Sequence, residues 1–244
     1  MKVYIQQVNG NYADDWSFAA YIGFNKLGAE IINFEEIEEV PLRKDIVVVA
    51  FVEDTLKYLQ YLNLEIPKPL NIPKSLELYS NRTFIPSIKF SDFKKDNIFD
   101  NKFFIKPANK TKEFMSGVVS TMKTLEGVVN DDSIVFVSEI IDIESEWRVF
   151  VHDKKIIGVQ NYAGNPFLIP DEFVVNQMIT KFDNQPIAYT LDIGVNKIDH
   201  QLQSFIIECN DGWSIGNYGL EGKAYAKMLR DRWFEMMKTL PNLK

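Results

Sequence analysis

Cysteine and histidine are almost missing from this chain of 244 residues, which has one cysteine, Cys209, and two histidines. A single cysteine excludes an internal disulfide, and no Cys/His cluster has the spacing of a zinc site. A lone cysteine in an apolar stretch is either a small core residue or a nucleophile, and the core role is the commoner one. The sequence therefore offers neither a disulfide framework nor a zinc centre.

Long apolar runs are missing as well. No stretch approaches the run of about 18 apolar residues that a membrane span needs. The first ten residues, MKVYIQQVNG, lack the continuous apolar segment of a signal peptide. We therefore expect a cytoplasmic protein that has no membrane partner.

Positive charge is in deficit, because 27 Lys and Arg stand against 34 Asp and Glu, for a formal net charge of −7. Without a Lys/Arg-rich run, nucleic acid is not expected as the main partner. The GxGxxG of dinucleotide folds, the GxxxxGK[ST] of P-loops and the HRD and DFG triplets of protein kinases are also absent. These absences argue against three common nucleotide-binding folds.

What remains is an ordinary globular composition, with 46% hydrophobic and 25% charged residues. Strand and helix patterns alternate over residues 1–75 and predict a small α/β domain. Its expected strands are 1–8, 29–34 and 45–51, and its expected helices are 14–27 and 53–62. Prolines at 67, 69 and 73 predict an extended connection to a second domain.

Residues 76–244 predict an α+β domain, with a smaller lobe at about 100–140 and a C-terminal lobe at about 141–244. Apolar and alternating patterns place strands at 103–107, 134–141, 146–152, 155–159, 188–195 and 204–210, and helices at 171–182 and 222–239. After the 155–159 strand, Asn161 and Tyr162 either line a substrate pocket or form an ordinary hairpin loop.

Polar side chains gather at the ends of these strands. Glu208 and Asn210 lie two apart at the end of an apolar run, so an extended backbone points both to one face. Asp192 offers a further carboxylate from the strand before it. Carboxylate and amide oxygens suit Mg²⁺, although a strand with polar ends followed by a turn is the alternative.

Two cationic side chains could face a phosphate. Lys106 ends an apolar strand, where a lysine either meets an anionic ligand or extends its ammonium into water. Arg148 lies on an alternating strand, and its planar group suits phosphate or carboxylate. The alternative for Arg148 is an ion pair with Glu144 or Glu146. Together with the oxygen ligands, such cations would form a nucleoside triphosphate site.

These stretches resemble the ATP-grasp superfamily, in particular its RimK-like carboxylate–amine ligase branch of bacterial and phage proteins. The matching segments are FIKP (104–107), KTKEFMSG (110–117), VSE (137–139), SEWRVFV (145–151), YTLDIGV (189–195) and IIECNDGWSIGNYG (206–219). The resemblance implies an α/β (α+β) fold in which a small N-terminal domain precedes two lobes that enclose ATP. The loop KTKEFMSG has one glycine where many relatives have several.

The resemblance also implies roles for individual residues. ATP phosphates, ribose and adenine would be bound by Lys106, Lys112, Glu139 and the backbone from Val137 to Ile140. Arg148 would contact the γ-phosphate or an acyl phosphate, and one or two Mg²⁺ ions would be held by Asp192, Glu208 and Asn210. The implied reaction joins a carboxylate of a small molecule or peptide to an amine. A phosphotransferase and an ATP-binding protein without turnover are the alternatives.

Overall fold

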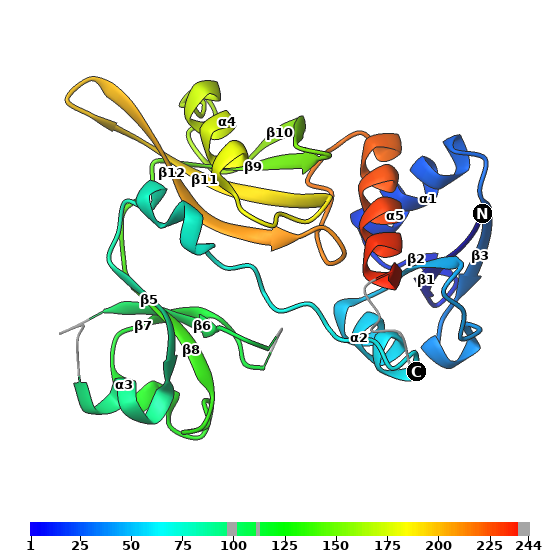
Figure 1. Ribbon diagram of the computed structural model, residues 1–244, viewed down its shortest axis with the longest axis horizontal. Coiled ribbons are helices and arrows are strands. Elements are labelled where there is room, and N and C mark those ends of the chain that lie inside the picture. The colour runs from blue at the N-terminus through cyan, green and yellow to red at the C-terminus, as the bar shows by residue number, and fades with distance from the viewer. Residues whose placement is uncertain (97–101, 111–112, 239–244) are drawn as a thin grey trace.

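The computed structural model describes residues 1–96, 102–110 and 113–238, so Lys112 lies outside the described residues. Within these ranges the strands form three four-stranded sheets. The first sheet lies on one side of the molecule. The other two sheets lie beyond a connecting segment, residues 62–73 (Figure 1). No described helix has both the length and the apolar character needed to cross a bilayer.

The first sheet is centred on β1 (Lys2–Val8), which pairs in parallel with β3 (Glu30–Phe34) and β4 (Ile46–Val49) and antiparallel with β2 (Asn11–Tyr12). All four residues of β4 are buried, because both faces of this parallel sheet are covered. A short 3₁₀ turn, η1 (Ile37–Glu39), and helix α2 (Val52–Tyr61) complete this region.

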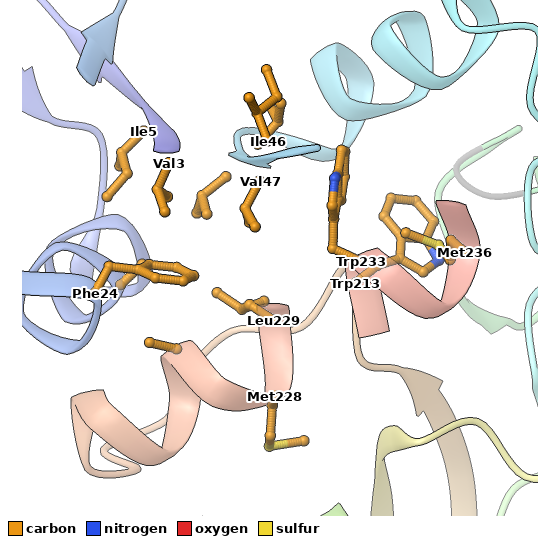
Figure 2. Close-up of a cluster of buried hydrophobic side chains, with 14 of the residues drawn as sticks. Val3, Ile5, Phe24, Ile46, Val47, Trp213, Met228, Leu229, Trp233 and Met236 are labelled. Carbon is orange, nitrogen blue, oxygen red and sulfur yellow. The ribbon is translucent and has the colours of Figure 1, made fainter. Parts of the chain in front are cut away.

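Helix α1 (Asp15–Lys26) begins at a capping box in which Asp14 and Ser17 exchange hydrogen bonds. It packs against the last helix, α5 (Gly222–Lys238), which therefore belongs to the core of the first sheet. Figure 2 shows this core, in which Val3, Phe24 and Trp233 come from opposite ends of the chain. The expected helices at 14–27, 53–62 and 222–239 are confirmed over the described residues.

The second sheet has the order β5-β8-β6-β7, from β5 (Phe84–Lys89), β6 (Phe103–Pro107), β7 (Gly117–Val119) and β8 (Ile134–Glu139). Helix α3 (Phe90–Asp96) and the 3₁₀ turn η3 (Met122–Leu125) accompany it. Strand β5 was not expected, because Pro86 interrupts its sequence pattern. Proline is tolerated there since β5 is an edge strand. This sheet therefore includes residues before the expected range of 100–140.

The third sheet is antiparallel with the order β10-β9-β11-β12. Its strands are β9 (Ser145–His152), β10 (Lys155–Gly164), β11 (Ala188–Ile198) and β12 (Gln201–Asp211). Helix α4 (Glu172–Lys181) packs on it through Val175, Met178 and Ile179. Strand β10 continues past the predicted end at Val159, so Asn161 and Tyr162 lie in the strand and not in a hairpin loop.

The connecting segment runs from α2 to the 3₁₀ turn η2 (Lys74–Tyr79) and crosses from the first sheet to the other two (Figure 1). Its prolines at 67, 69 and 73 favour the extended backbone that was expected there. The domain boundaries of 1–75 and 76–244 remain a proposal, since α5 returns to the first sheet from the far end of the chain.

Candidate active site

Three polar residues meet on neighbouring strands in the middle of the third sheet. Asp192 on β11 lies directly opposite Arg148 on β9 and directly opposite Glu208 on β12. Directly opposed side chains in antiparallel strands are close neighbours on one face of the sheet. The fold thus brings Arg148 next to Asp192, 44 positions later in the sequence, and Asp192 next to Glu208, 16 positions later.

Arg148 and Asp192 form a two-pronged ion pair. Nε of Arg148 donates to Oδ1 of Asp192 at 2.8 Å, and Nη2 donates to Oδ2 at 2.7 Å. The two residues are only 8% and 3% exposed. Burial raises the pKa of Asp192, and the Arg148 charge offsets part of that rise. The partner of Arg148 is therefore Asp192, and neither Glu144 nor Glu146.

Lys106 reaches the same group from the end of β6 in the second sheet. Its Nζ lies 2.6 Å from Oε2 of Glu208 and 5.0 Å from the centre of the Phe136 ring. Burial raises the pKa of Glu208, but the Lys106 charge and the Asn210 amide outweigh it and leave the pKa below its ordinary value. Lys106 is thus a buried cation with a carboxylate partner, and its ammonium does not extend into water.

Asn210 lies between the two carboxylates. Its Nδ2 is 3.1 Å from Oδ2 of Asp192 and 3.1 Å from Oε1 of Glu208. A partly positive amide hydrogen thus occupies the position where a cation would contact both carboxylates, and rotation of the amide would offer its oxygen instead. These hard oxygen donors fit Mg²⁺. No cluster of three His, Cys, Asp or Glu residues suited to a metal occurs in the described part of the chain.

A β-bulge directs these donors. The pairing of β11 with β12 shifts between Asp192–Glu208 and Ile193–Ile206, which leaves Ile207 as the extra residue. Bulges re-aim the side chains beside them and are common next to functional sites. Strand alternation beyond the bulge places Glu208 and Asn210 on the face of Asp192 and Cys209 in the core, and the bulge lets Ile206, which would otherwise share the face of Glu208, join that core.

Two tyrosines flank the arginine. The guanidinium carbon of Arg148 lies 4.2 Å from the ring centre of Tyr218 and 5.9 Å from that of Tyr162. Tyr162 donates its hydroxyl hydrogen to Oε2 of Glu146 at 2.9 Å. Contact with aromatic faces and a bidentate carboxylate fixes the plane of the guanidinium. Tyr162, for which a pocket residue and a hairpin loop were the two alternatives, lines the cavity that contains Glu146, and Tyr218, which no sequence pattern indicated, lines the one that contains Arg148.

This charged group consists of five residues, Lys106, Arg148, Asp192, Glu208 and Asn210. Three cavities are each lined by members of the charged group. One of about 350 Å³ has aliphatic and aromatic walls that include Phe104, Ile140 and Ile207, and it reaches Lys106 and Glu208. A second, of about 560 Å³, lies on the side of Arg148 and Asn210. The third, of about 220 Å³, lies along the connecting segment and includes both Lys106 and Glu208. The first combines apolar walls with the cations Arg82 and Lys106 and with the carboxylates of Glu139, Glu146, Asp192 and Glu208, a lining that can take a nucleotide with a bound cation.

The predicted adenine and ribose residues lie at the first cavity or near it. Glu139 lines it, and its Oε1 accepts a hydrogen bond of 2.6 Å from the Thr83 amide. Ile140 follows the end of β8 and is 40% exposed on the cavity wall. The Val137 side chain is fully buried in the core of the second sheet, and strands pair with it on both sides. Glu139 and Ile140 are therefore better placed to contact a ligand than Val137.

Arg82 is a candidate that the sequence analysis missed. It lines the 350 Å³ cavity, donates from Nη2 to the Ile207 carbonyl at 2.6 Å and places Nε in a buried position without a hydrogen-bond partner among the described residues. Burial lowers its pKa. A partly buried guanidinium with an unused donor could bind an anion, although the letters around it, SNRTF, predict only a loop.

Comparison with known proteins agrees with this geometry. A family profile described as “ATP-grasp domain, R2K clade family 2” matches residues 84–228. This chain belongs to the R2K clade of ATP-grasp domains. The matched range contains the second and third sheets with all the residues of the charged group. No curated protein matches this ATP-grasp protein in sequence.

Solved structures share its fold. A D-alanine–D-alanine ligase from Bacillus anthracis complexed with ATP has a TM-score of 0.56 at 13% identity, over 98% of this chain and 98% of the ligase. A RimK domain ATP-grasp protein from Sphaerobacter thermophilus has a TM-score of 0.56 at 12% identity, over 94% and 99%. An N5-carboxyaminoimidazole synthetase from Staphylococcus aureus has a TM-score of 0.59 at 11% identity, over 99% and 78%. At these identities the likeness concerns the fold alone.

Proposed function

We propose that this ATP-grasp protein is an ATP- and Mg²⁺-dependent carboxylate–amine ligase. The observation that carries the proposal is the convergence of Lys106, Arg148, Asp192, Glu208 and Asn210, which line a cavity of about 350 Å³ on one side and one of about 560 Å³ on the other. The ligases among proteins of the same fold add support. The substrates are a carboxylate and an amine of a small molecule or a peptide.

In the proposed reaction the 350 Å³ cavity binds adenine and ribose, with Glu139 and Ile140 on its wall. Lys106 and Arg82 then bind phosphate oxygens, and their charges offset that of the triphosphate. Asp192, Glu208 and Asn210 would hold Mg²⁺, which would supply charge neutralisation for the triphosphate. In this step the ammonium of Lys106 leaves the carboxylate of Glu208 and pairs with a phosphate oxygen instead.

Arg148 faces the 560 Å³ cavity, so the substrate carboxylate is placed there beside the γ-phosphate. A carboxylate oxygen attacks the γ-phosphorus, the bond from that phosphorus to the β,γ-bridging oxygen breaks, and ADP leaves. The amine then attacks the acyl carbon, phosphate departs with the electrons of the C–O bond, and the amine loses a proton. Such chemistry depends on positioning and on charge neutralisation and needs no protein nucleophile.

The test is release of ADP in the presence of Mg²⁺, ATP and pools of amino acids and short peptides. Hydroxylamine traps an acyl phosphate as a hydroxamate, so a ligase gives ADP and hydroxamate in equal amounts. ADP with a stable phosphorylated product and no hydroxamate would instead identify a phosphotransferase. Tight ATP binding with no ADP release for any carboxylate would contradict the ligase proposal.

A further inference from the structure

Asn71, in the connecting segment, bonds to both sheets that form the charged group. Its carbonyl oxygen accepts a hydrogen bond of 2.6 Å from the backbone N–H of Cys209, and its Nδ2 donates to the Ala108 carbonyl at 2.9 Å. Cys209 stands between Glu208 and Asn210, and Ala108 follows Lys106 by two positions. One residue therefore joins the strand of the two expected Mg²⁺ ligands to the strand end of the phosphate-binding lysine.

The bond to Cys209 matters because β12 is the edge strand of its sheet. One side of β12 pairs with β11, and the backbone groups on its other side need different partners. Asn71 forms an isolated antiparallel bridge with Cys209, and Arg82 donates to the adjacent Ile207 carbonyl. Both contacts lie at the bulge, where the pairing with β11 is irregular and the edge has the least support of its own.

Asn71 is itself held firmly in place. Leu70 and Ile72 pack into the core of the third sheet, and Ile72 is 4% exposed. The backbone φ of Asn71 is +52°, in the left-handed region that asparagine and glycine enter more readily than other residues. This turn is what aims the Asn71 carbonyl at β12 and its amide at Ala108.

We infer that Asn71 is a positioning residue for the ATP site, which sets the distance between the end of β6 and the edge of β12. The inference rests on the proposed function, because it assumes that Lys106, Glu208 and Asn210 act on one Mg·ATP. Asn71 also lines the 220 Å³ cavity, but its amide is bonded to Ala108 and its carbonyl to Cys209, so we infer that it acts through these residues. Supporting groups of this kind typically change metal affinity or activity by about 10- to 100-fold when removed.

The test uses two variants of the full chain and a nonhydrolysable ATP analogue, which needs no knowledge of the substrates. Asn71→Gly keeps the left-handed backbone and the carbonyl but removes the donor to Ala108. Asn71→Asp keeps the size and places an acceptor against that carbonyl. Asn63 is a matched control, because it has a φ of +53° and is exposed at the end of α2. Asn63→Gly and Asn63→Asp therefore make the same changes away from the site.

Calorimetric titration of the analogue at several Mg²⁺ concentrations is the readout. Both Asn71 variants should weaken Mg²⁺-dependent binding by about 10-fold or more, while both Asn63 variants bind as the unchanged chain does. Faster hydrogen exchange at the Cys209 amide should accompany the loss. A lower melting temperature with unchanged Mg²⁺ dependence would show a merely structural role and overturn the inference.

Normal Mg²⁺ dependence in Asn71→Gly overturns the inference whatever Asn71→Asp shows, because Gly lacks the bond to Ala108. If Asn71→Asp fails to fold, Asn71→Gly alone decides. Failure of the unchanged chain to bind the analogue at any Mg²⁺ concentration is a different outcome. It would overturn the proposed function, and the inference with it.

Discussion

The ammonium of Lys106 and the carboxylate of Glu208 are paired at 2.6 Å, across two different sheets. In the proposed function these two groups bind different parts of Mg·ATP, so each must give up the other when the ligand arrives. ATP without Mg²⁺ would place additional negative charge beside the Glu208 carboxylate. Mg²⁺ without ATP would bind next to the positive charge of Lys106. We therefore expect Mg²⁺ and ATP to strengthen each other's binding.

Lys106→Ala should raise the dissociation constant for Mg·ATP by about 10- to 100-fold, since a hydrogen bond to a charged group contributes about 1.5–3 kcal/mol. Calorimetry or a fluorescent ATP analogue gives the constant. Lys102→Ala is the control, because Lys102 precedes the same strand and is exposed. Equal affinity in the Lys106 and Lys102 variants would remove Lys106 from the site.

Glu208→Gln and Asn210→Ala should each abolish Mg²⁺-dependent ADP release and leave the fold intact. Glu208→Gln replaces a charged Mg²⁺ ligand by a neutral one of the same shape, and Asn210→Ala removes the third oxygen donor. ADP release as a function of Mg²⁺ concentration, with circular dichroism for the fold, checks both. Glu172→Gln, at an exposed position in the first turn of α4, is the control. Unchanged turnover in either site variant would contradict the proposed Mg²⁺ ligands.

Arg82→Ala should weaken nucleotide binding, again by about 10-fold or more, because it removes a charged donor from the 350 Å³ cavity. Arg82→Lys should recover only part of the affinity, since a lysine lacks the planar group that bonds to the Ile207 carbonyl. Titration with ADP and with ATP separates contacts to the terminal phosphate from the others. If Arg82→Ala binds both nucleotides normally, Arg82 has only a structural role.

Gly23→Ala should lower the free energy of unfolding by about 1–3 kcal/mol, the usual cost of overfilling a packed contact. A Cβ at Gly23 on α1 would overlap the backbone carbonyl of Gly222 at the start of α5. Urea unfolding measures the change. Gly117→Ala is the control, because a Cβ there meets no atom within 4 Å. Equal stability of the two variants would mean that α1 and α5 do not pack this closely.

The stability of the chain should depend on Glu221 at neutral pH but not in strong acid. Glu221 bonds to Lys26 and to the Ala224 amide at the start of α5, contacts that lower its pKa from 4.5 to about 2. Because the pKa of Glu221 is lower in the folded than in the unfolded chain, its carboxylate stabilises the fold at pH values above the unfolded-state pKa, and this contribution disappears as the pH falls toward 2. The melting-temperature difference between the unchanged chain and Glu221→Gln should therefore vanish over that range. A difference independent of pH would contradict the charged role of Glu221.

Much of the fold was predictable, because the strands around the site have strong local patterns. The apolar run before Glu208, the alternation around Arg148 and the apolar strand that ends at Lys106 each indicate one element without outside information. Spacing alone also placed Glu208 and Asn210 on one face. The edge strand β5 was not predictable, because Pro86 breaks its pattern and its pairing with β8 is what makes it a strand.

The sequence by itself determined the strands and helices around the site and the charged residues at their ends, since the alternation of polar and apolar residues along the backbone is a local property. Only the tertiary structure decided that Arg148 pairs with Asp192 and Lys106 with Glu208, because those partners are chosen by strand pairing and by contact between two sheets. It also decided the positions of Arg82 and Asn71. Their neighbours in sequence are loop residues, and their importance comes from backbone groups of β12 more than 100 residues away.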